Sequence, residues 1–362
     1  MNVLFLTETR FTKAPYREGS VRYRCYHLAE ALLKAGHLAD VGLVATLDLA
    51  NLSRYDVVCV HRPGASRKLL SVLERCNKLG VKTVADFDAL LFDPSIAKHV
   101  VDGDKNPTQL ATLRAESMRH NLALQHFDHV TVATEALAKH RRAQQPTQPC
   151  HVVTNGLSKF WLSHNDHIKP RFPNTRTIGY FSDSVRMARD FSVAEEAIGA
   201  FVKSDRRSTL NIVGPMGLND VNLDAHYVNQ GQWIDFMNMP LQLTQSWVTI
   251  APLRTSAFND AKPHTKFIES AAFGVPCIAT PTAELREHKV PGLHLADTKE
   301  DWLHALNALS DKSYYRECQT ALYDYARDCC LAQHHIDTWV QQWTDSVKTQ
   351  DHETAPALSA TG

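Results

Sequence analysis

Lysine, histidine, threonine and glutamate gather in one short segment of the chain, as Lys262, His264, Thr265, Lys266 and Glu269. The surrounding pattern predicts a strand, a polar loop and then a helix that begins near these residues. Unpaired N–H groups at a helix N-terminus attract anions, so the two lysines beside them would bind a diphosphate. Glu269 follows Lys266 by one turn, where a carboxylate could accept hydrogen bonds from a vicinal diol. A solvated helix start with a Lys–Glu pair is the other interpretation.

A second group of polar residues follows two apolar runs that read as buried strands. His61 and Arg62 follow a run that ends at Val60, and Asp86 and Asp88 follow a later run. The imidazole is a candidate acid, base or hydroxyl partner, because its charge changes near neutral pH. Asp86 and Asp88 form the pattern D-x-D, but a divalent cation needs more oxygen ligands than this pair supplies. We therefore predict no metal site, and we expect these carboxylates to contact a substrate or to order a loop.

The loop after the first apolar run supplies further candidates. Gly19 would let the backbone approach a phosphate closely, and Arg22 and Arg24 follow it at the start of a predicted helix. These arginines either reach a substrate or are simply solvated. The 8 cysteines form no C-x-x-C pair, which favours reduced, buried thiols over a zinc site or a disulfide framework.

Short apolar runs alternate with amphipathic stretches along most of the chain. This alternation predicts an α/β fold with two doubly wound parallel sheets, whose ligands bind at the carboxyl ends of the strands. A stretch with Pro170 and Pro173 interrupts the rhythm and predicts a linker, and Trp339 and Trp343 give a late helix an aromatic face. The predicted parts are an N-terminal domain at 1–160, a linker at 161–175, a C-terminal domain at 176–330, a helix at 331–348 that returns to the N-terminal domain, and a tail at 349–362.

Composition narrows the class of protein. The 362 residues include 39 Lys and Arg and 39 Asp and Glu. A general nucleic-acid binder would need a basic excess, so we expect no nucleic-acid partner. The apolar run near the N-terminus is short for a signal peptide, and no run approaches the ~20 apolar residues of a membrane span. We expect a cytoplasmic protein, with peripheral association at the inner face of a membrane as a further possibility.

One segment resembles a known family. Asn259, Lys262, Lys266 and Glu269, followed by the sequence AAFGVPCIAT, resemble the donor-binding segment of family 4 retaining glycosyltransferases. The resemblance continues in residues 178–184 and in three further segments, at 190–191, 153–156 and 20–37, and so covers nearly the whole chain. It implies the GT-B architecture, in which two Rossmann-like domains face each other across a cleft.

The resemblance also implies an activity and a division of roles. The chain would transfer a sugar from a nucleotide diphosphate donor, UDP- or GDP-linked, to a hydroxyl of a glycan or lipid-linked acceptor. Retention would follow a front-face route without metal or other cofactor, in which the departing phosphate takes the acceptor proton, and Glu269 would bind the ribose. The expected catalytic residues are His61, Asp86 and Lys266; the donor-binding residues are Gly19, Ser182, Arg186, Asn259, Lys262, His264, Thr265, Lys266 and Glu269; and the acceptor-side residues are Arg22, Arg24, Arg62 and Asp88.

The chain departs from the family pattern at two places. Ala261 stands where the family often has the first glutamate of Glu-x7-Glu, so Asn259, Asp260 or the backbone of Lys262 would take its place. The family's Arg and Lys of the first C-terminal loop fall near Ser182 and Met187, and Arg186 or Arg189 would supply the charge instead. These departures leave two alternatives open. One is a sugar-nucleotide epimerase or hydrolase, which would turn over donor without acceptor. The other is a non-catalytic sugar-nucleotide-binding protein, which would bind without any transfer.

Overall fold

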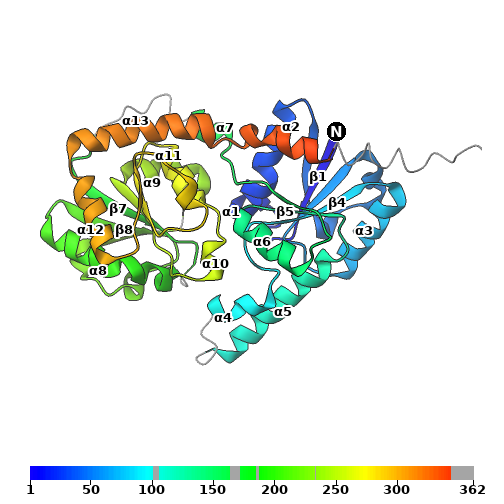
Figure 1. Ribbon diagram of the computed structural model, residues 1–362, viewed down its shortest axis with the longest axis horizontal. Helices are drawn as coiled ribbons and strands as arrows, with labels where there is room; N and C mark the ends of the chain where they lie inside the picture. The colour runs from blue at the N-terminus through cyan, green and yellow to red at the C-terminus, as the bar shows by residue number, and fades with distance from the viewer. Residues whose placement is uncertain (101–105, 164–171, 185–186, 233, 344–362) are drawn as a thin grey trace, which may run out of the picture.

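The computed structural model describes residues 1–100, 106–163, 172–184, 187–232 and 234–343. Two α/β units lie side by side, and each contains a sheet with helices on both of its faces (Figure 1). Both sheets are entirely parallel across the strand pairs described. The predicted α/β fold with two doubly wound domains is therefore confirmed.

The N-terminal unit has a sheet of six strands in the order β2-β1-β3-β4-β5-β6. Its strands are β1 (Asn2–Thr7), β2 (Leu38–Leu43), β3 (Val57–His61), β4 (Lys82–Phe87), β5 (His129–Val132) and β6 (Cys150–Val152). Its helices are α1 (Gly19–Val21), which continues as a π-helical turn (Arg22–Tyr26), α2 (His27–Lys34), α3 (Arg67–Leu79), α4 (Ala97–Val100), α5 (Pro107–Leu124), α6 (Glu135–Gln144) and α7 (Lys159–Ser163).

The C-terminal unit has a second six-stranded sheet, and its order from one edge is β9-β8-β7-β10-β11-β12. This is the Rossmann order 3-2-1-4-5-6, in which the direction of winding reverses between the first and fourth strands. The strands are β7 (Arg176–Phe181), β8 (Ser208–Val213), β9 (Val228–Gly231), β10 (Val248–Ala251), β11 (Cys277–Ala279) and β12 (Leu293–Leu295). The helices are α8 (Ala188–Ser204), α9 (Met239–Gln245), α10 (Ala257–Asp260), α11 (Thr265–Ala271), α12 (Lys299–Ala308) and α13 (Lys312–Cys329).

Strand β1 shows how the apolar runs create the core. Side chains alternate between the two faces of a strand. The side chains from Val3 to Leu6 are all apolar, because helices cover both faces of the sheet. Val3 and Phe5 face one cluster, whereas Leu4 and Leu6 face another. The N-terminal sheet is therefore buried on both sides, which makes it a rigid support for the loops that follow its strands.

The C-terminal end of the chain returns to the N-terminal unit. Helix α13 runs along one edge of the molecule toward that unit (Figure 1). At the crossing, a side chain on Gly156 would collide with the backbone of Ala332, so only glycine allows the two segments to lie this close. Beyond the crossing, Trp339 is buried and lies 5.8 Å from Phe5, centroid to centroid. The expected tail at 349–362 lies outside the described residues.

Several predicted boundaries shift in the structure. Strands β9 and β12 are short and partly exposed, and the sequence analysis missed both because neither forms a continuous apolar run. The stretch expected to begin a linker at position 161 instead lies within α7, where Trp161 is buried among residues of the C-terminal unit. Helix α11 begins at Thr265, among the polar residues where the sequence predicts a helix start.

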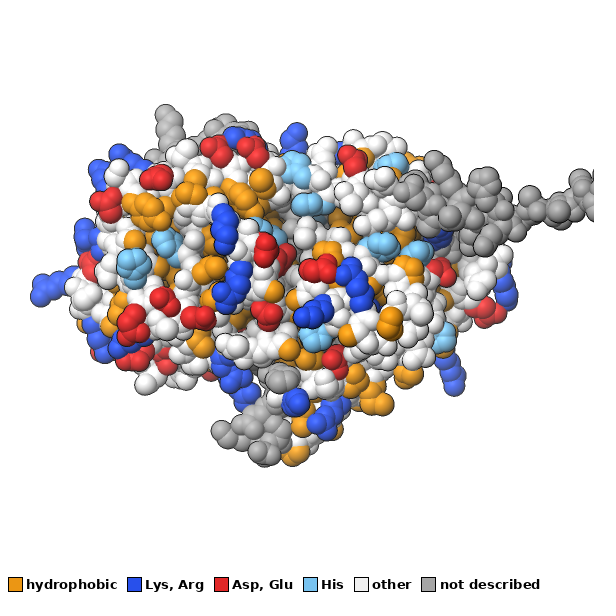
Figure 2. Space-filling view, in the orientation of Figure 1, with side chains coloured by type: hydrophobic (Ala, Val, Ile, Leu, Met, Phe, Trp, Pro, Cys, Tyr) orange, Lys and Arg blue, Asp and Glu red, His pale blue; other side chains and the backbone are white. Residues whose placement is uncertain are grey.

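The surface shows no concentration of one charge on the face in Figure 2, where basic and acidic side chains are interspersed. Within the described ranges, no helix is both long and apolar enough to cross a membrane. All eight cysteines are free thiols and seven are buried, with Cys329 exposed.

Candidate active site

A concave site lies between the two units, at the carboxyl ends of both sheets. Its volume is about 630 Å³, within the ~300–1,000 Å³ typical of small-molecule sites. Residues that follow β7 and β10 line it, and these two strands flank the point where the winding of the C-terminal sheet reverses. Ligands of doubly wound sheets bind at that point. Among the predicted site residues, those that line the cavity are Gly19, Arg22, Arg62, Asp88, Ser182, Lys262, His264, Thr265, Lys266 and Glu269.

Helix α11 and the loop before it bring the two lysines and the glutamate to the cavity. Lys266 Nζ donates a hydrogen bond to the backbone carbonyl of Phe181, at the end of β7. Lys262 Nζ lies 3.6 Å from a carboxylate oxygen of Asp190. Burial lowers the pKa of Lys262, and the Asp190 carboxylate opposes that shift. The Lys266 ammonium group is therefore held at the end of β7, and that of Lys262 at the first turn of α8.

Glu269 is only 5% exposed, and it still borders the cavity. Its Oε1 accepts a hydrogen bond of 2.8 Å from the phenol of Tyr23, which comes from the N-terminal unit. Burial raises the pKa of Glu269, and the nearby Arg22 guanidinium and the Tyr23 hydrogen bond counteract part of that rise. The carboxylate is thus placed where hydroxyl donors from a ligand would be strongly favoured.

His264 and Thr265 have partners that the sequence analysis did not anticipate. The backbone N–H of His264 donates to Glu284 Oε2 at 3.0 Å, and its Nδ1 lies 2.7 Å from Glu284 Oε1. The backbone N–H of His264 is therefore already hydrogen-bonded within the protein and is not available to a ligand. Thr265 Oγ1 accepts a hydrogen bond from Asn155 Nδ2 at 3.2 Å, which links α11 to the N-terminal unit.

Asn259 lies behind the cavity wall rather than on it. Its Nδ2 donates to Asp190 Oδ1 at 2.9 Å and to the carbonyl of Arg254 at 2.8 Å, and the side chain is buried. Asp190 therefore contacts both Asn259 and Lys262, and it acts as the anchor of this loop. The prediction that Asn259 touches the donor is not supported by this placement.

The loop after β7 passes close to the loop after β8. Ser182 Oγ accepts a hydrogen bond of 3.2 Å from the backbone N–H of Met216. Gly214 has φ +125°, and a side chain there would collide with the carbonyl of Ser182. Glycine is therefore required for this close approach, which shapes one wall of the cavity. Arg186 lies outside the described residues, and Arg189 is exposed.

The N-terminal unit contributes Arg62 and Asp88 to the opposite wall. Arg62 follows β3 with φ 48°, a left-handed conformation that is uncommon for a non-glycine residue and is often found at functional sites. Its Nε donates to Asp88 Oδ1 at 2.7 Å. Burial would raise the pKa of Asp88, but the Arg62 guanidinium and the His61 ring hold it below its usual value.

Three predicted residues form a buried network behind this wall. Asp86 is 1% exposed and accepts hydrogen bonds from Arg24 Nη2 at 2.5 Å and from Thr131 Oγ1 at 2.7 Å, with His61 Nδ1 at 3.0 Å. Burial would raise the pKa of Asp86, but Arg24 and His61 hold it well below its usual range. None of Arg24, His61 and Asp86 lines the cavity. Direct substrate contact is expected for all three from the sequence, but this placement does not support it, because none of them reaches the cavity. His61 Nε2 is buried without a hydrogen-bond partner and lies 3.9 Å from Asp88 Oδ1.

Arg22 does reach the cavity, and it crosses to the other unit. Its guanidinium lies over the ring of Phe236, 4.2 Å from the centroid, and its Nη1 donates to the carbonyl of Tyr16 at 3.0 Å. Thr134 makes a further crossing. Its Oγ1 caps α6 by accepting from Leu137 N–H, as its place before Glu135 predicts, and it also donates to the carbonyl of Ala261 at 3.0 Å.

Tyr23, Asn155, Asp190 and Phe236 are the site residues that sequence reasoning missed. The family-like segment at 153–156 and the residue next to Arg22 were weak signals for two of them. The family-like segment at 190–191 was a similar signal for Asp190, whereas Phe236 gave none, because its partner Arg22 lies more than 200 positions away along the chain. Among the described residues, no group of three or more His, Cys, Asp or Glu side chains could hold a metal ion.

Comparison with solved structures identifies the architecture. HepE from Anabaena, in complex with UDP and glucose, is 13% identical; the match covers 95% of this chain and 100% of HepE, with a TM-score of 0.61. An α-glucosyltransferase in complex with UDP and a 13-mer DNA containing an HMU base is 9% identical over 94% of this chain and 99% of its own, with a TM-score of 0.66. The fold is GT-B.

A third GT-B likeness is a protein designated a UDP-N-acetylglucosamine 2-epimerase, from Listeria monocytogenes. It is 14% identical over 98% of this chain and 97% of its own, with a TM-score of 0.50. No family model and no curated protein sequence matches the chain. These identities are low, so the likeness establishes the GT-B fold alone.

Proposed function

We propose that the protein is a glycosyltransferase that moves a sugar from a nucleotide diphosphate donor to a hydroxyl group of a glycan or lipid-linked acceptor. The observation that carries this proposal is the grouping of Lys262, Lys266 and Glu269 on one wall of the cavity between the units. The two ammonium groups suit the diphosphate of a nucleoside diphosphate, and the buried carboxylate suits its ribose hydroxyls. UDP is the favoured nucleotide, because HepE and the α-glucosyltransferase are both complexes with UDP.

On the donor side, each residue would act on a different part of the nucleotide. The Glu269 carboxylate would accept hydrogen bonds from the ribose hydroxyls, and Lys262 and Lys266 would neutralise the diphosphate. Negative charge develops on that diphosphate as the sugar bond breaks, and a preorganised cation lowers the energy of that state. Lys266 would supply this stabilisation without a metal, and it is the residue we assign as catalytic.

On the acceptor side, Arg62, Asp88 and Arg22 remain available to contact the acceptor, because they line the cavity. His61, Asp86 and Arg24 would act as positioning residues. Arg24 links Asp86 to Asn155 through a hydrogen bond of 3.0 Å, and Asn155 in turn contacts Thr265 at the start of α11. The buried network would thus hold the acceptor wall and the donor helix in a fixed relation.

The stereochemical part of the proposal follows from the resemblance to family 4. Retention would proceed at one face of the sugar, with the departing phosphate taking the acceptor proton. This route suits the site, because the buried His61 and Asp86 are poorly placed to act as a base. Contacts between the units, such as Tyr23–Glu269, would exclude water that could otherwise hydrolyse the donor.

A sugar-nucleotide epimerase is the second candidate, and the likeness to the Listeria protein favours it. Such an enzyme would bind a nucleotide sugar through the same donor-binding residues and would need no acceptor. The two activities are separated by incubating the protein with UDP-sugars alone and following both epimerised sugar and UDP. Epimerised sugar without acceptor would replace the transferase proposal, whereas UDP release that depends on an added glycan or glycolipid would support it.

The direct test is UDP binding, measured by titration calorimetry. Glu269→Ala should weaken binding by ~1–3 kcal/mol, because the ribose hydroxyls lose a charged acceptor. Glu287→Ala is a matched control, since Glu287 is an exposed glutamate of the same unit and lies away from the cavity. Equal UDP affinity in Glu269→Ala and wild type, or no UDP binding by the wild type, would overturn the assignment of this site.

A further inference from the structure

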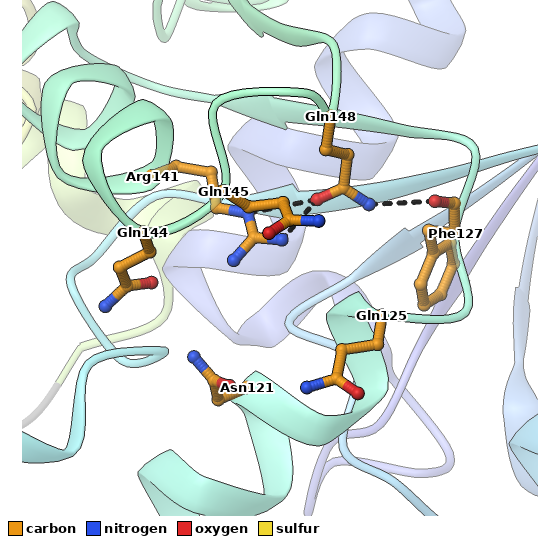
Figure 3. Close-up of a pocket in the computed structure, with 7 residues that line it drawn as sticks. All are labelled: Asn121, Gln125, Phe127, Arg141, Gln144, Gln145 and Gln148. Atoms are coloured by element: carbon orange, nitrogen blue, oxygen red, sulfur yellow. Dashed lines mark hydrogen bonds between the residues drawn. The ribbon is translucent and has the colours of Figure 1, made fainter.

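A second cavity lies in the N-terminal unit, away from the cleft. Its volume is about 420 Å³. It is formed where α5 and α6 end and where the chain enters β5 and β6, so it opens at the amino ends of these strands, whereas the cleft lies at their carboxyl ends. Six of the seven residues that line it carry a carboxamide or a guanidinium: Asn121, Gln125, Arg141, Gln144, Gln145 and Gln148, with Phe127 as the seventh (Figure 3).

Arg141 is the unusual member of this group. The side chain is 4% exposed, and both its Nε, at 3.0 Å, and its Nη2 donate to the same neutral acceptor, Gln148 Oε1. Within the described part of the chain, no carboxylate forms an ion pair with it. The adjacent Arg142, by contrast, is exposed and lies 2.5 Å from a Glu135 carboxylate oxygen. A buried cation normally has a counterion, because removing a charge from water is costly.

The surroundings satisfy only part of this charge. Arg141 lies in the last turn of α6, where the helix carbonyls carry a partial negative charge. Burial lowers the pKa of Arg141, and among its neighbours only the Cys150 thiol opposes the shift. A guanidinium has five N–H donors, and Gln148 accepts two of them. Donors therefore remain for a ligand that carries negative charge.

Gln148 is fixed in its orientation, which in turn fixes Arg141. Its Nε2 donates to the carbonyls of Leu124 at 2.9 Å and Phe127 at 2.8 Å. The amide oxygen must then face the guanidinium, as Figure 3 shows. The charged group is thus preorganised at the cavity rather than free to swing into solvent.

The remaining lining indicates what kind of ligand fits. Gln144 and Gln145 come from the end of α6 and the residue after it, as Arg141 does, and Asn121 and Gln125 are drawn below the guanidinium in Figure 3. Each carboxamide both donates and accepts hydrogen bonds, as vicinal hydroxyl groups require. A simple anion would use only the guanidinium, and a nucleotide base would want an exposed aromatic face, whereas Phe127 is buried.

We propose that this cavity binds an acidic carbohydrate unit, a pyranose ring that carries a carboxylate. The carboxylate pairs with the Arg141 guanidinium, and the ring hydroxyls hydrogen-bond to the surrounding carboxamides. The site is separate from the donor cleft and does not need it for binding. Its use to hold a remote part of the acceptor glycan rests on the proposed function.

The test uses D-glucuronate as the probe, with glucose and acetate as comparison ligands, in saturation-transfer NMR on the full chain. Glucuronate should bind. Glucose, which lacks the carboxylate, and acetate, which lacks the ring hydroxyls, should each bind about tenfold more weakly. Acetate that competes as well as glucuronate would reduce the site to a plain anion site and overturn the proposal. No binding of glucuronate would also overturn it.

Variants connect the binding to the cavity. Arg141→Met keeps the packing of the aliphatic stem and should abolish the preference for glucuronate over glucose. If that variant does not fold, the exposed pair Gln144→Ala and Gln145→Ala should still weaken glucuronate binding by roughly threefold or more. Gln245→Ala, an exposed glutamine of the other unit, is the matched control.

UDP titration of the same proteins separates the two proposals. UDP affinity should be unchanged in every cavity variant, since the donor site lies at the opposite end of the strands. Loss of glucuronate binding with intact UDP binding would show that the second site is real and independent. Unchanged glucuronate binding in Arg141→Met or in the glutamine pair would contradict the assignment of this cavity.

Discussion

The phenol of Tyr23, from the N-terminal unit, donates a 2.8 Å hydrogen bond to the carboxylate of Glu269 in the C-terminal unit. Both side chains are buried, and burial raises the pKa of each group. A buried carboxylate needs donors, and in this structure Tyr23 supplies one. The atom that we assign to the ribose is therefore already engaged across the cleft, so a nucleotide must share or replace that hydrogen bond.

Tyr23→Phe should strengthen UDP binding, because the ribose no longer competes with the phenol for Glu269 Oε1. The expected gain is about 1 kcal/mol, roughly fivefold in Kd. Titration calorimetry measures it directly. Weaker binding in Tyr23→Phe would mean that the phenol orients the carboxylate for the ribose instead of competing with it.

Asp86 and Asp88 should respond differently to the same change, although they are separated by one residue. Asp86→Asn leaves the buried Arg24 without its counterion and should lower the free energy of unfolding by ~3–5 kcal/mol. Asp88→Asn weakens an ion pair whose Arg62 side chain is 28% exposed, so it should lower the free energy of unfolding by only about 1 kcal/mol. Urea denaturation of both variants checks the contrast.

The activity of the same two variants gives the complementary readout. Asp88 lines the cavity and Asp86 does not. Acceptor-dependent UDP release is measured under conditions where both proteins are fully folded. Asp88→Asn should slow this release mainly by raising the KM for the acceptor. A similar loss of stability in both variants would contradict the view that Asp86 is the centre of a buried network.

Most of the fold could be predicted from the sequence because the buried parallel strands leave a strong local signal. Val57–His61 is apolar nearly throughout, and a sheet that is covered on both faces requires this. The edge strands β9 and β12 escaped prediction because exposed edges need no such run. Both segments become strands by pairing with their neighbours β8 and β11, and this pairing cannot be predicted from the local sequence.

The site was predictable where a motif is local and where a loop follows a buried strand, as at Arg62 and Asp88. Lys262, Lys266 and Glu269 lie within one loop and helix, and all three reach the cavity. Arg22 and Arg24 look equivalent in the sequence, but one lines the cavity while the other is buried against Asp86, 62 positions later. Residues two apart on a helix do not share a face, but which of the two arginines faces the cavity depends on how the π-helical turn at Arg22–Tyr26 packs, and the local sequence does not reveal that.

His27 should make the stability depend on pH. Burial lowers its pKa from 6.5 to about 4, and the ring contacts the Gly156 carbonyl through Nδ1 at 2.8 Å. As the pH falls from 6.5 toward 4, the unfolded chain binds a proton that the folded chain does not. Folding therefore loses up to about 3 kcal/mol from this group over that range.

The variant His27→Asn isolates this contribution, since its amide nitrogen can take the place of Nδ1 without titrating. Urea denaturation at pH 7 and pH 5 should show a smaller pH-dependent loss for His27→Asn than for the wild type. Other histidines that are partly buried, such as His120 and His294, also have lowered pKa values and remain in both proteins, so only the difference is diagnostic. An identical slope in both proteins would mean that His27 is not buried in its neutral form.

Lys266→Ala should reduce turnover far more than it reduces stability. The ammonium group is held at the cavity by the Phe181 carbonyl, beside the position assigned to the leaving diphosphate. Because it would stabilise charge that appears only as the sugar bond breaks, its loss should lower kcat by ~10²–10³-fold with a smaller change in donor KM. UDP release from the UDP-sugar that wild type turns over measures both constants, with Lys203→Ala, an exposed lysine of α8, as control. A raised KM with unchanged kcat would show instead that Lys266 only binds the donor, and the diphosphate would then need another source of stabilisation, for which Lys262, on the same wall of the cavity, is the candidate.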